Sequence, residues 1–345
     1  FSNYNVDKKG LVINNSSTKN HKSGVVQSKL AGMIITNQNL EDIDSATVII
    51  NQVNSSNITN INGYSEIAGK KASLIIANPN GIIVNGGGFI NTSKLTLIAG
   101  KETTINQNKS NQNISNRPDL HFQITSKPHI ESGFLPKIII SGSGIDLTNV
   151  YTSTIIANRI ELNSGIYSSQ NNVKIASGND KYDYKNNKVS SVDDRQLLED
   201  GTRIAIDASS ICDIQAGNIF IETTQEKSKI NFLGTAYVDA GDIQINSKGD
   251  IYYKNAKIKS ELFSTKSYYG NISIQNNNAI DSTNTNISAG YSLKVNNSHI
   301  KSDNLNFKSN NKDVAINDVF SEGTIILALP FAKREEIIVA KLSSG

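Results

Sequence analysis

Short apolar segments separated by polar corners recur along this chain, and their spacing constrains the fold more than any other feature. In the second half they include Ile219-Phe220-Ile221, Ile243-Gln244-Ile245 and Ile272-Ser273-Ile274. Three apolar beats complete a period of about 20 residues, which is the length of one coil of a β-solenoid. An antiparallel sandwich would give longer strands at a steadier spacing, and a doubly wound α/β fold would need helices that these gaps cannot hold. The pattern therefore predicts an all-β solenoid.

The composition agrees with many short strands and polar corners. The sequence holds 46 Asn residues alongside abundant Ser, Thr and Ile. Asn and Ser favour turns, whereas Ile and Thr favour strands. A net charge of +3 with scattered Lys, and the absence of Trp, argue against a nucleic-acid partner. No apolar run approaches the ~20 residues of a transmembrane helix, and the single cysteine excludes an internal disulfide. The opening at Phe1 is typical of a mature or trimmed fragment.

A tetrad of the form Ile-Ile-x-Asn occurs three times in the first half, at Ile34–Asn37, Ile75–Asn78 and Ile155–Asn158. Its starts lie 41 and 80 positions apart, near two and four coils. Stacked coils would place like residues above like. We therefore expect Ile stacks inside the solenoid and Asn ladders along its corners.

Two stretches interrupt the rhythm, and we expect them to leave the coil as hairpins or loops. The first, residues 106–137, holds three of the five prolines; the second, residues 177–200, is polar and rich in charge. The organisation that we predict is one β-helix domain over residues 1–325, followed by a tail or cap over residues 326–345.

The segment Asn78-Pro79-Asn80-Gly81 has the composition of a β-turn. Asn at the first position can accept a hydrogen bond from the backbone, Pro presets φ at the second, and Gly tolerates the exit. A phosphate-binding loop would require a helix after the glycine. The residues that follow, beginning at Ile82, have the pattern of a strand. A nucleotide site is therefore not predicted here.

These residues resemble the N-terminal secretion domain of two-partner-secretion exoproteins, the filamentous-haemagglutinin and contact-dependent-growth-inhibition group. Asn78-Pro79-Asn80-Gly81-Ile82 stands where that family carries its Asn-Pro-Asn-Gly-Ile/Leu motif, and Gly86–Leu97 fits the next segment. Asn37-Gln38-Asn39-Leu40 fits the earlier Asn-Pro-Asn-Leu motif, with Gln38 in place of Pro. The resemblance is strongest over residues 1–180, and the rest of the chain resembles the family only in its generic coil repeats.

The resemblance implies a right-handed parallel β-helix with a capped end. It also implies export to the bacterial cell surface through a cognate outer-membrane barrel transporter, whose periplasmic POTRA-type domains bind the chain while it is unfolded or partly folded. Strand pairing with an exposed sheet edge is the natural binding mode. Successive stacking of coils outside the cell would then favour outward movement. The turn has a simpler alternative role, in which Asn78–Ile82 only stabilises a corner.

Two other function classes stay open on the sequence. An adhesin would bind a glycan or a target-cell receptor through Tyr182, Asp183 and Tyr184, because Tyr combines an apolar ring with a polar tip. A polysaccharide-degrading β-helix enzyme would need carboxylates on one face, and the candidates are Asp180, Asp183, Asp193, Asp194 and Asp207. The four histidines, His21, His121, His129 and His299, have no metal-ligand spacing, and Cys212 is expected to be a small buried residue. No enzyme activity, metal or cofactor is predicted.

Overall fold

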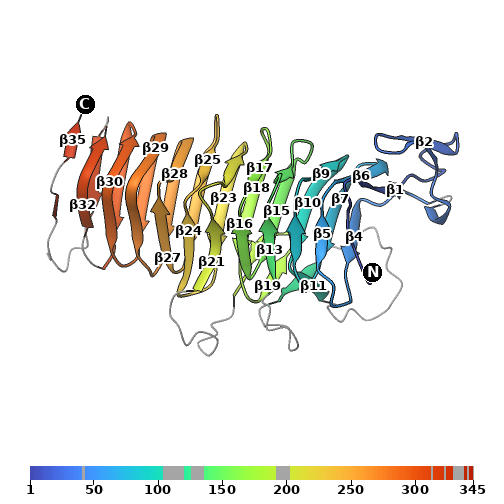
Figure 1. Cartoon of the computed structure of the whole chain (residues 1–345), viewed down its shortest axis with the longest axis horizontal. Helices are drawn as coiled ribbons and strands as arrows, with labels where there is room; N and C mark the ends of the chain where they lie inside the picture. Colours follow the sequence, from blue (N-terminus) through green and yellow to red (C-terminus); the bar gives the residue numbers. More distant parts are fainter. Residues whose placement is uncertain are drawn as a thin grey trace. The chain divides into compact units, whose positions relative to one another are not determined.

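The computed structural model describes residues 1–40, 43–103, 120–125, 136–191, 203–311, 314–321, 324–328, 338–339 and 342–344. They form two compact units. Unit 1 comprises Phe1–Arg159 and Gly178–Val192, and unit 2 comprises Ile160–Ser177 and Asp193–Gly345. Parallel strands stacked in successive coils build each unit (Figure 1). The expected all-β parallel solenoid is confirmed, whereas the assignment of residues 1–325 to one domain stays a prediction.

The described residues of unit 1 form eleven short coil strands. They are β1 (Leu11–Asn15), β4 (Val48–Gln52), β5 (Thr59–Ile61), β6 (Tyr64–Gly69), β7 (Ala72–Ala77), β8 (Ile82–Val84), β9 (Gly87–Ile90), β10 (Thr92–Ile98), β13 (Lys137–Ile140), β14 (Ile145–Asp146) and β15 (Thr152–Ala157). Strand β7 pairs in parallel with β10, which pairs in parallel with β15. In this stack Ile76, Leu97 and Ile155 are aligned, and all three are fully buried.

Unit 2 continues the same pattern with longer strands toward the C-terminus. Its strands are β16 (Arg159–Leu162, beginning at the last residue of the first segment of unit 1), β17 (Gly165–Tyr167), β18 (Asn172–Ser177), β21 (Arg203–Ala208), β22 (Asp213–Gln215), β23 (Asn218–Thr223), β24 (Ser228–Phe232), β25 (Thr235–Tyr237), β26 (Asp242–Ser247), β27 (Asp250–Lys254), β28 (Lys257–Ser267), β29 (Ile272–Ala289), β30 (Leu293–Lys301), β31 (Asn304–Ser309), β32 (Val314–Ser321), β33 (Thr324–Ala328), β34 (Ile338–Val339) and β35 (Leu342–Ser344). Strands β33 to β35 contain the described residues of the expected tail, 326–345.

The regularly spaced apolar residues of the second half of the sequence line the interior of unit 2. Ile272 pairs with Leu293, which pairs with Val314, each step being 21 residues. Side chains alternate between the two faces of a strand, so every second residue points inward and packs on its counterpart in the next coil. These three side chains are at most 1% exposed. The expected coil length of about 20 residues is confirmed.

The tetrads do not stack as the sequence suggested. Ile34 and Ile35 belong to β3, which pairs with β2 in a hairpin outside the coils. Ile155 aligns through Leu97 with Ile76 rather than with Ile75, so these two tetrads are one residue out of register; the pairing of β10 with β7 also shifts by one residue between Thr92 and Leu95. Counting positions in the sequence does not reveal such a bulge.

Asn ladders do form, but within strands rather than at corners. The Asn304 Nδ2 atom donates to Asn284 Oδ1 and the Asn306 Nδ2 atom to Asn286 Oδ1, both at 2.9 Å. Each pair consists of aligned residues on β29 and β31. Aligned parallel strands bring identical amides within hydrogen-bonding distance, which satisfies their donors on a polar outer face.

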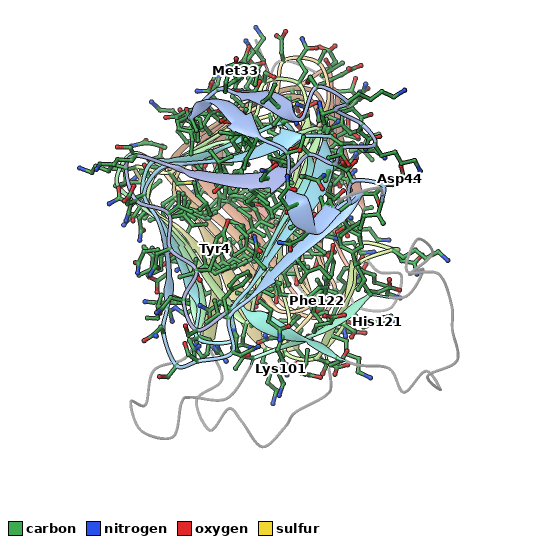
Figure 2. All side chains as sticks on the ribbon, turned by 90° about the vertical axis from the view of Figure 1, so that its right-hand side faces the viewer. Tyr4, Met33, Asp44, Lys101, His121 and Phe122 are labelled. Atoms are coloured by element: carbon green, nitrogen blue, oxygen red, sulfur yellow. The ribbon has the colours of Figure 1, made fainter. Side chains whose placement is uncertain are left out.

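Antiparallel elements stand outside the coils, as predicted. Strands β2 (Val25–Ser28) and β3 (Gly32–Ile35) form a hairpin at the N-terminal end of unit 1 (Figures 1 and 2). Strands β11 (Gly100–Thr103), β12 (His121–Ile124), β19 (Lys181–Asp183) and β20 (Lys188–Val189) form a four-stranded side sheet. The described parts of both interruptions contribute to this sheet. Within the described residues the helical segment η1 (Gln38–Leu40) is a single 3-10 turn, and no helix there could cross a membrane.

Candidate functional site

The segment Asn78–Ile82 forms the tight corner between β7 and β8. The Gly81 N–H donates to the Asn78 carbonyl at 3.1 Å, and the Asn80 N–H donates to Asn78 Oδ1 at 2.8 Å. Gly81 has a φ of +108° and a Cβ there would lie 2.7 Å from the Lys137 carbonyl oxygen. Only glycine meets both requirements without strain. The β-turn predicted from the sequence is therefore present.

The two asparagine amides tie this corner to the preceding coil. Asn78 Nδ2 donates to the Asn57 carbonyl and to Thr59 Oγ1, each at 2.9 Å. Asn80 Nδ2 donates to the Ser55 carbonyl at 2.6 Å. Asn78 is fully buried and Asn80 is 9% exposed. In the folded domain both side chains are thus engaged internally, and buried amides left without partners would each cost about 1–3 kcal/mol.

The segment Asn37–Leu40 repeats the same hydrogen-bond pattern on the surface. The Asn39 N–H donates to Asn37 Oδ1 at 3.0 Å, and the Leu40 N–H donates to the Asn37 carbonyl at 2.9 Å. Asn37 Nδ2 donates to the Asn14 carbonyl of β1 at 2.9 Å. Gln38, which replaces the proline of the motif, is exposed, as is Asn39, whereas Leu40 is half-buried. The turn forms without proline because Asn37 alone provides both acceptors.

The two turns therefore differ in accessibility rather than in backbone pattern. The second Asn of the first turn, Asn39, faces solvent, while its counterpart Asn80 lies inside the domain. Each turn is held by a different part of unit 1: Asn37 by β1, and Asn78 by Thr59 of β5 and the residues before it. A partner that contacts the asparagine side chains of both motifs must therefore meet the second one before the domain folds.

The residues Tyr182, Asp183 and Tyr184 lie on the side sheet. Tyr182 is fully buried, its hydroxyl donates to Asn187 Oδ1 at 2.9 Å, and burial raises its pKa. Its ring packs edge-on against Tyr184, whose ring lies 3.9 Å from Lys94 Nζ. The side sheet is thereby anchored to the coil. The proposed role of this segment in partner binding stays a prediction, and in the folded domain only Asp183 and Tyr184 are half-exposed.

The residues considered for catalysis are distributed over the molecule. Asp180 belongs to unit 1 and Asp207 to unit 2, while Asp193, Asp194 and His129 lie outside the described residues. No group of His, Cys, Asp or Glu within the described ranges could hold a metal ion. Cys212 is buried, as predicted, and burial raises the pKa of its thiol to about 12. A thiol with such a pKa is a poor nucleophile at neutral pH.

The sequence did not identify Glu66 as a structural residue. This carboxylate is 3% exposed, and it accepts hydrogen bonds from the Ser28 hydroxyl and from the Lys29 and Leu30 N–H groups. The sequence signal for this role is an acidic residue, Glu66, directly before the apolar residues Ile67 and Ala68 of β6. The Glu66 side chain connects the N-terminal hairpin to the first coils.

Comparison with known proteins gives a consistent family. Residues 1–253 match the family model described as TPS secretion domain. The chain is 31% identical over 256 residues to a tRNA nuclease CdiA of Escherichia coli strain STEC_O31, an alignment that covers 74% of this chain and 7% of that protein. It is 30% identical over 251 residues to a toxin CdiA of Yersinia pestis, covering 72% of this chain and 7% of that toxin.

A solved structure shows the same fold. The crystal structure of the filamentous hemagglutinin secretion domain superimposes with a TM-score of 0.61 and 20% sequence identity, covering 92% of this chain and 88% of that one. The chain spans less than a tenth of the length of the curated relatives that it matches.

Proposed function

The chain belongs to the family of TPS secretion domains, and on this premise we propose that a cognate outer-membrane transporter recognises it while it is unfolded. The periplasmic POTRA-type domains of that transporter would bind the extended chain. The domain would then fold on the outer surface of the cell as part of a larger exported protein. The nuclease names of the relatives belong to proteins of which this chain covers 7–8%, and the proposal assigns no catalytic step to it.

The observation that carries the proposal is the burial of the Asn78–Ile82 motif. In the folded domain the amides of Asn78 and Asn80 donate to residues 55–59 and are almost inaccessible. A transporter that recognises these side chains must do so before the corner closes. Folding would bury the two asparagine amides that the transporter recognises, and this burial would release the chain from the transporter.

Successive coils can also make export directional without a nucleotide. Most coil-to-coil contacts join residues about 20 to 24 positions apart, as in Ile219 with Ile243 and Asn284 with Asn304. Each emerging coil can therefore stack on the one before it, burying apolar side chains and completing its backbone ladder. Backward movement would require that stacked coil to unfold.

A binding experiment tests recognition of the unfolded state. The variant Ile76→Asp places a carboxylate at a fully buried position of β7 while leaving Asn78–Ile82 unchanged, and an unpaired buried charge prevents stable folding. We expect the purified periplasmic part of the transporter to capture this variant and not the folded wild-type domain. The matched control is Ile211→Asp, since Ile211 is 70% exposed and its variant should stay folded. Equal capture of the folded wild type would contradict the proposal.

An export assay separates recognition from folding. Asn39→Ala removes an exposed side chain of the first motif, whereas Asn80→Ala removes the buried counterpart. We expect Asn39→Ala to lower export while the free energy of unfolding stays unchanged. If export instead follows stability alone across both variants, the motifs serve folding only and transporter recognition through them is wrong.

A further inference from the structure

The N-terminal hairpin β2–β3 presents an apolar outer face. Val25 is paired with Ile35, and Gln27 is paired with Met33. Because side chains alternate along a strand, these four residues share one face. Val25 is 37% exposed, Met33 62% and Ile35 67%. Figure 2 labels Met33 on the N-terminal hairpin of unit 1 and, apart from it, the buried Tyr4 of the same unit.

The opposite face of the same hairpin is fastened to the coils. Val26 is buried and the Ser28 hydroxyl donates to Glu66, while Leu30 of the turn, 38% exposed, lies beside Gly10. The hairpin is therefore attached to the coils through its inner face, and the apolar residues of its outer face are exposed in this attached position. A rigid two-stranded element with an apolar outer face is a liability for a soluble protein unless something covers that face.

Exposed lysines lie in the turns at both ends of the hairpin and in the neighbouring turn before Gly10. Lys29 lies in the hairpin turn, and Lys8 and Lys9 lie in the turn before Gly10, whose backbone adjoins Leu30. Lys22 lies at the other end of the hairpin, where the Gly24 N–H donates to the His21 carbonyl. All four lysines are exposed. The described acidic groups nearby are Glu66, which is buried, Asp44, which pairs with Lys19, and Asp7, whose carboxylate accepts from the Lys9 N–H.

We propose that this face, defined by Val25, Met33 and Ile35 with Lys8, Lys9, Lys22 and Lys29, docks on an anionic lipid surface. The three apolar side chains enter the boundary between headgroups and acyl chains, and the ammonium groups contact lipid phosphates. Apolar insertion and attraction to anionic headgroups are the two terms of interfacial membrane binding. Long Lys side chains can lie along the apolar surface while their charges reach the headgroups. The folded domain would thereby rest with its N-terminal end on a membrane.

Vesicle flotation of the folded wild-type domain tests the proposal without a transporter. One set of vesicles contains phosphatidylcholine alone, and the other contains equimolar phosphatidylcholine and phosphatidylglycerol. We expect binding to the anionic vesicles at least about tenfold above the neutral ones, and its loss in about 1 M salt, where the screening length is about 3 Å. Equal binding to both vesicle types, or no binding to either, would overturn the proposal.

Variants locate the contact on the hairpin. We expect Met33→Asn with Ile35→Asn, and separately Lys8→Glu with Lys9→Glu, each to reduce binding by about tenfold. Ile211→Asn is the matched control, because Ile211 is comparably exposed but lies in unit 2, and it should leave binding unchanged. Unfolding curves identical to wild type show that each variant is folded.

Two further results would count against a lipid partner. An equal loss in the Ile211→Asn control would show that binding is non-specific. Vesicle binding that stays at the wild-type level in both hairpin variants would show that this face does not contact the lipid. Because vesicle binding concerns the folded domain alone, its failure leaves the proposed secretion role intact.

Discussion

The Ser28 hydroxyl donates a 2.7 Å hydrogen bond to the Glu66 carboxylate, 38 positions away in the sequence. The same carboxylate accepts from the Lys29 and Leu30 N–H groups at 2.8 Å, and the Ser28 hydroxyl accepts from the Ala31 N–H at 3.0 Å. One buried side chain of β6 thus orders the hairpin turn. The apolar outer face of the hairpin owes its rigid placement to this contact.

Replacing Glu66 by Gln should destabilise the domain. The glutamine side chain would keep one acceptor oxygen but would direct an amide donor toward a backbone N–H donor. We expect the free energy of unfolding in urea to fall by about 2 kcal/mol, the cost of leaving a buried donor unsatisfied. Glu226→Gln, at an exposed position, should change it by less than about 0.5 kcal/mol. Equal effects of the two variants would contradict this role of Glu66.

The two motif asparagines should differ in their contribution to stability. Asn80→Ala removes the donor to the Ser55 carbonyl and leaves that region of the corner incompletely bonded. We expect a loss of about 1–3 kcal/mol in urea unfolding. Asn39→Ala, at the equivalent exposed position, should have an effect within about 0.5 kcal/mol. A large effect of Asn39→Ala would show that the first turn is more than a surface corner.

Cys212 should report the folding state of unit 2. It is the single cysteine of the chain and is 1% exposed. Burial raises the pKa of its thiol to about 12, so little thiolate is present at mildly alkaline pH. We expect an aromatic disulfide reagent to label the native domain slowly and the urea-unfolded chain completely. Rapid labelling of the native domain would mean that this coil opens readily.

Tyr182 should be a structural residue of the side sheet. Its ring contacts Phe122 and Tyr184, and its hydroxyl donates to Asn187. Tyr182→Ala should therefore lower the free energy of unfolding by about 3–5 kcal/mol, as for other buried aromatic residues. Tyr167→Ala, whose ring is 40% exposed, should cost much less in the same urea titration. A loss of less than about 1 kcal/mol for Tyr182→Ala would indicate that the side sheet contributes little to stability.

Asp146 should contribute to stability only above acidic pH. Burial raises its pKa, but hydrogen bonds from the Thr148 side chain and N–H and from the Tyr64 hydroxyl outweigh burial, so the pKa lies below 3.8. A lowered pKa adds stability above the unfolded value, and this is lost as the pH falls through the folded value. Since Asp146 is partly exposed, Asp146→Asn should cost less than about 1 kcal/mol at neutral pH.

The difference between wild type and Asp146→Asn should disappear well below pH 3.8. Thermal unfolding of both proteins across this range measures it. A difference that persists at the lowest pH would show that the Asn side chain disturbs packing rather than removing a charge.

The sequence alone determined the repeating coil and the corner at Asn78–Gly81. A period of about 20 residues leaves no room for helices between the strands, and the turn residues impose their backbone angles locally. Both features depend on neighbours in the sequence or on a regular repeat, so they can be read without coordinates. Ile272 illustrates this, because it belongs to an apolar segment visible in the sequence and pairs with Leu293, one coil of 21 residues later.

The tertiary structure decided what depends on contacts between irregularly spaced residues. Glu66 reaching Ser28, the burial of Tyr182, and the accessibility that separates Asn39 from Asn80 all follow from which segments fold back on the coils. The bulge in β10 likewise sets which residue of β7 pairs with each residue from Leu95 to Ile98. The local conformational propensities of the residues do not predict such contacts, because the free energy that selects them comes from burial and hydrogen bonding between distant parts of the chain.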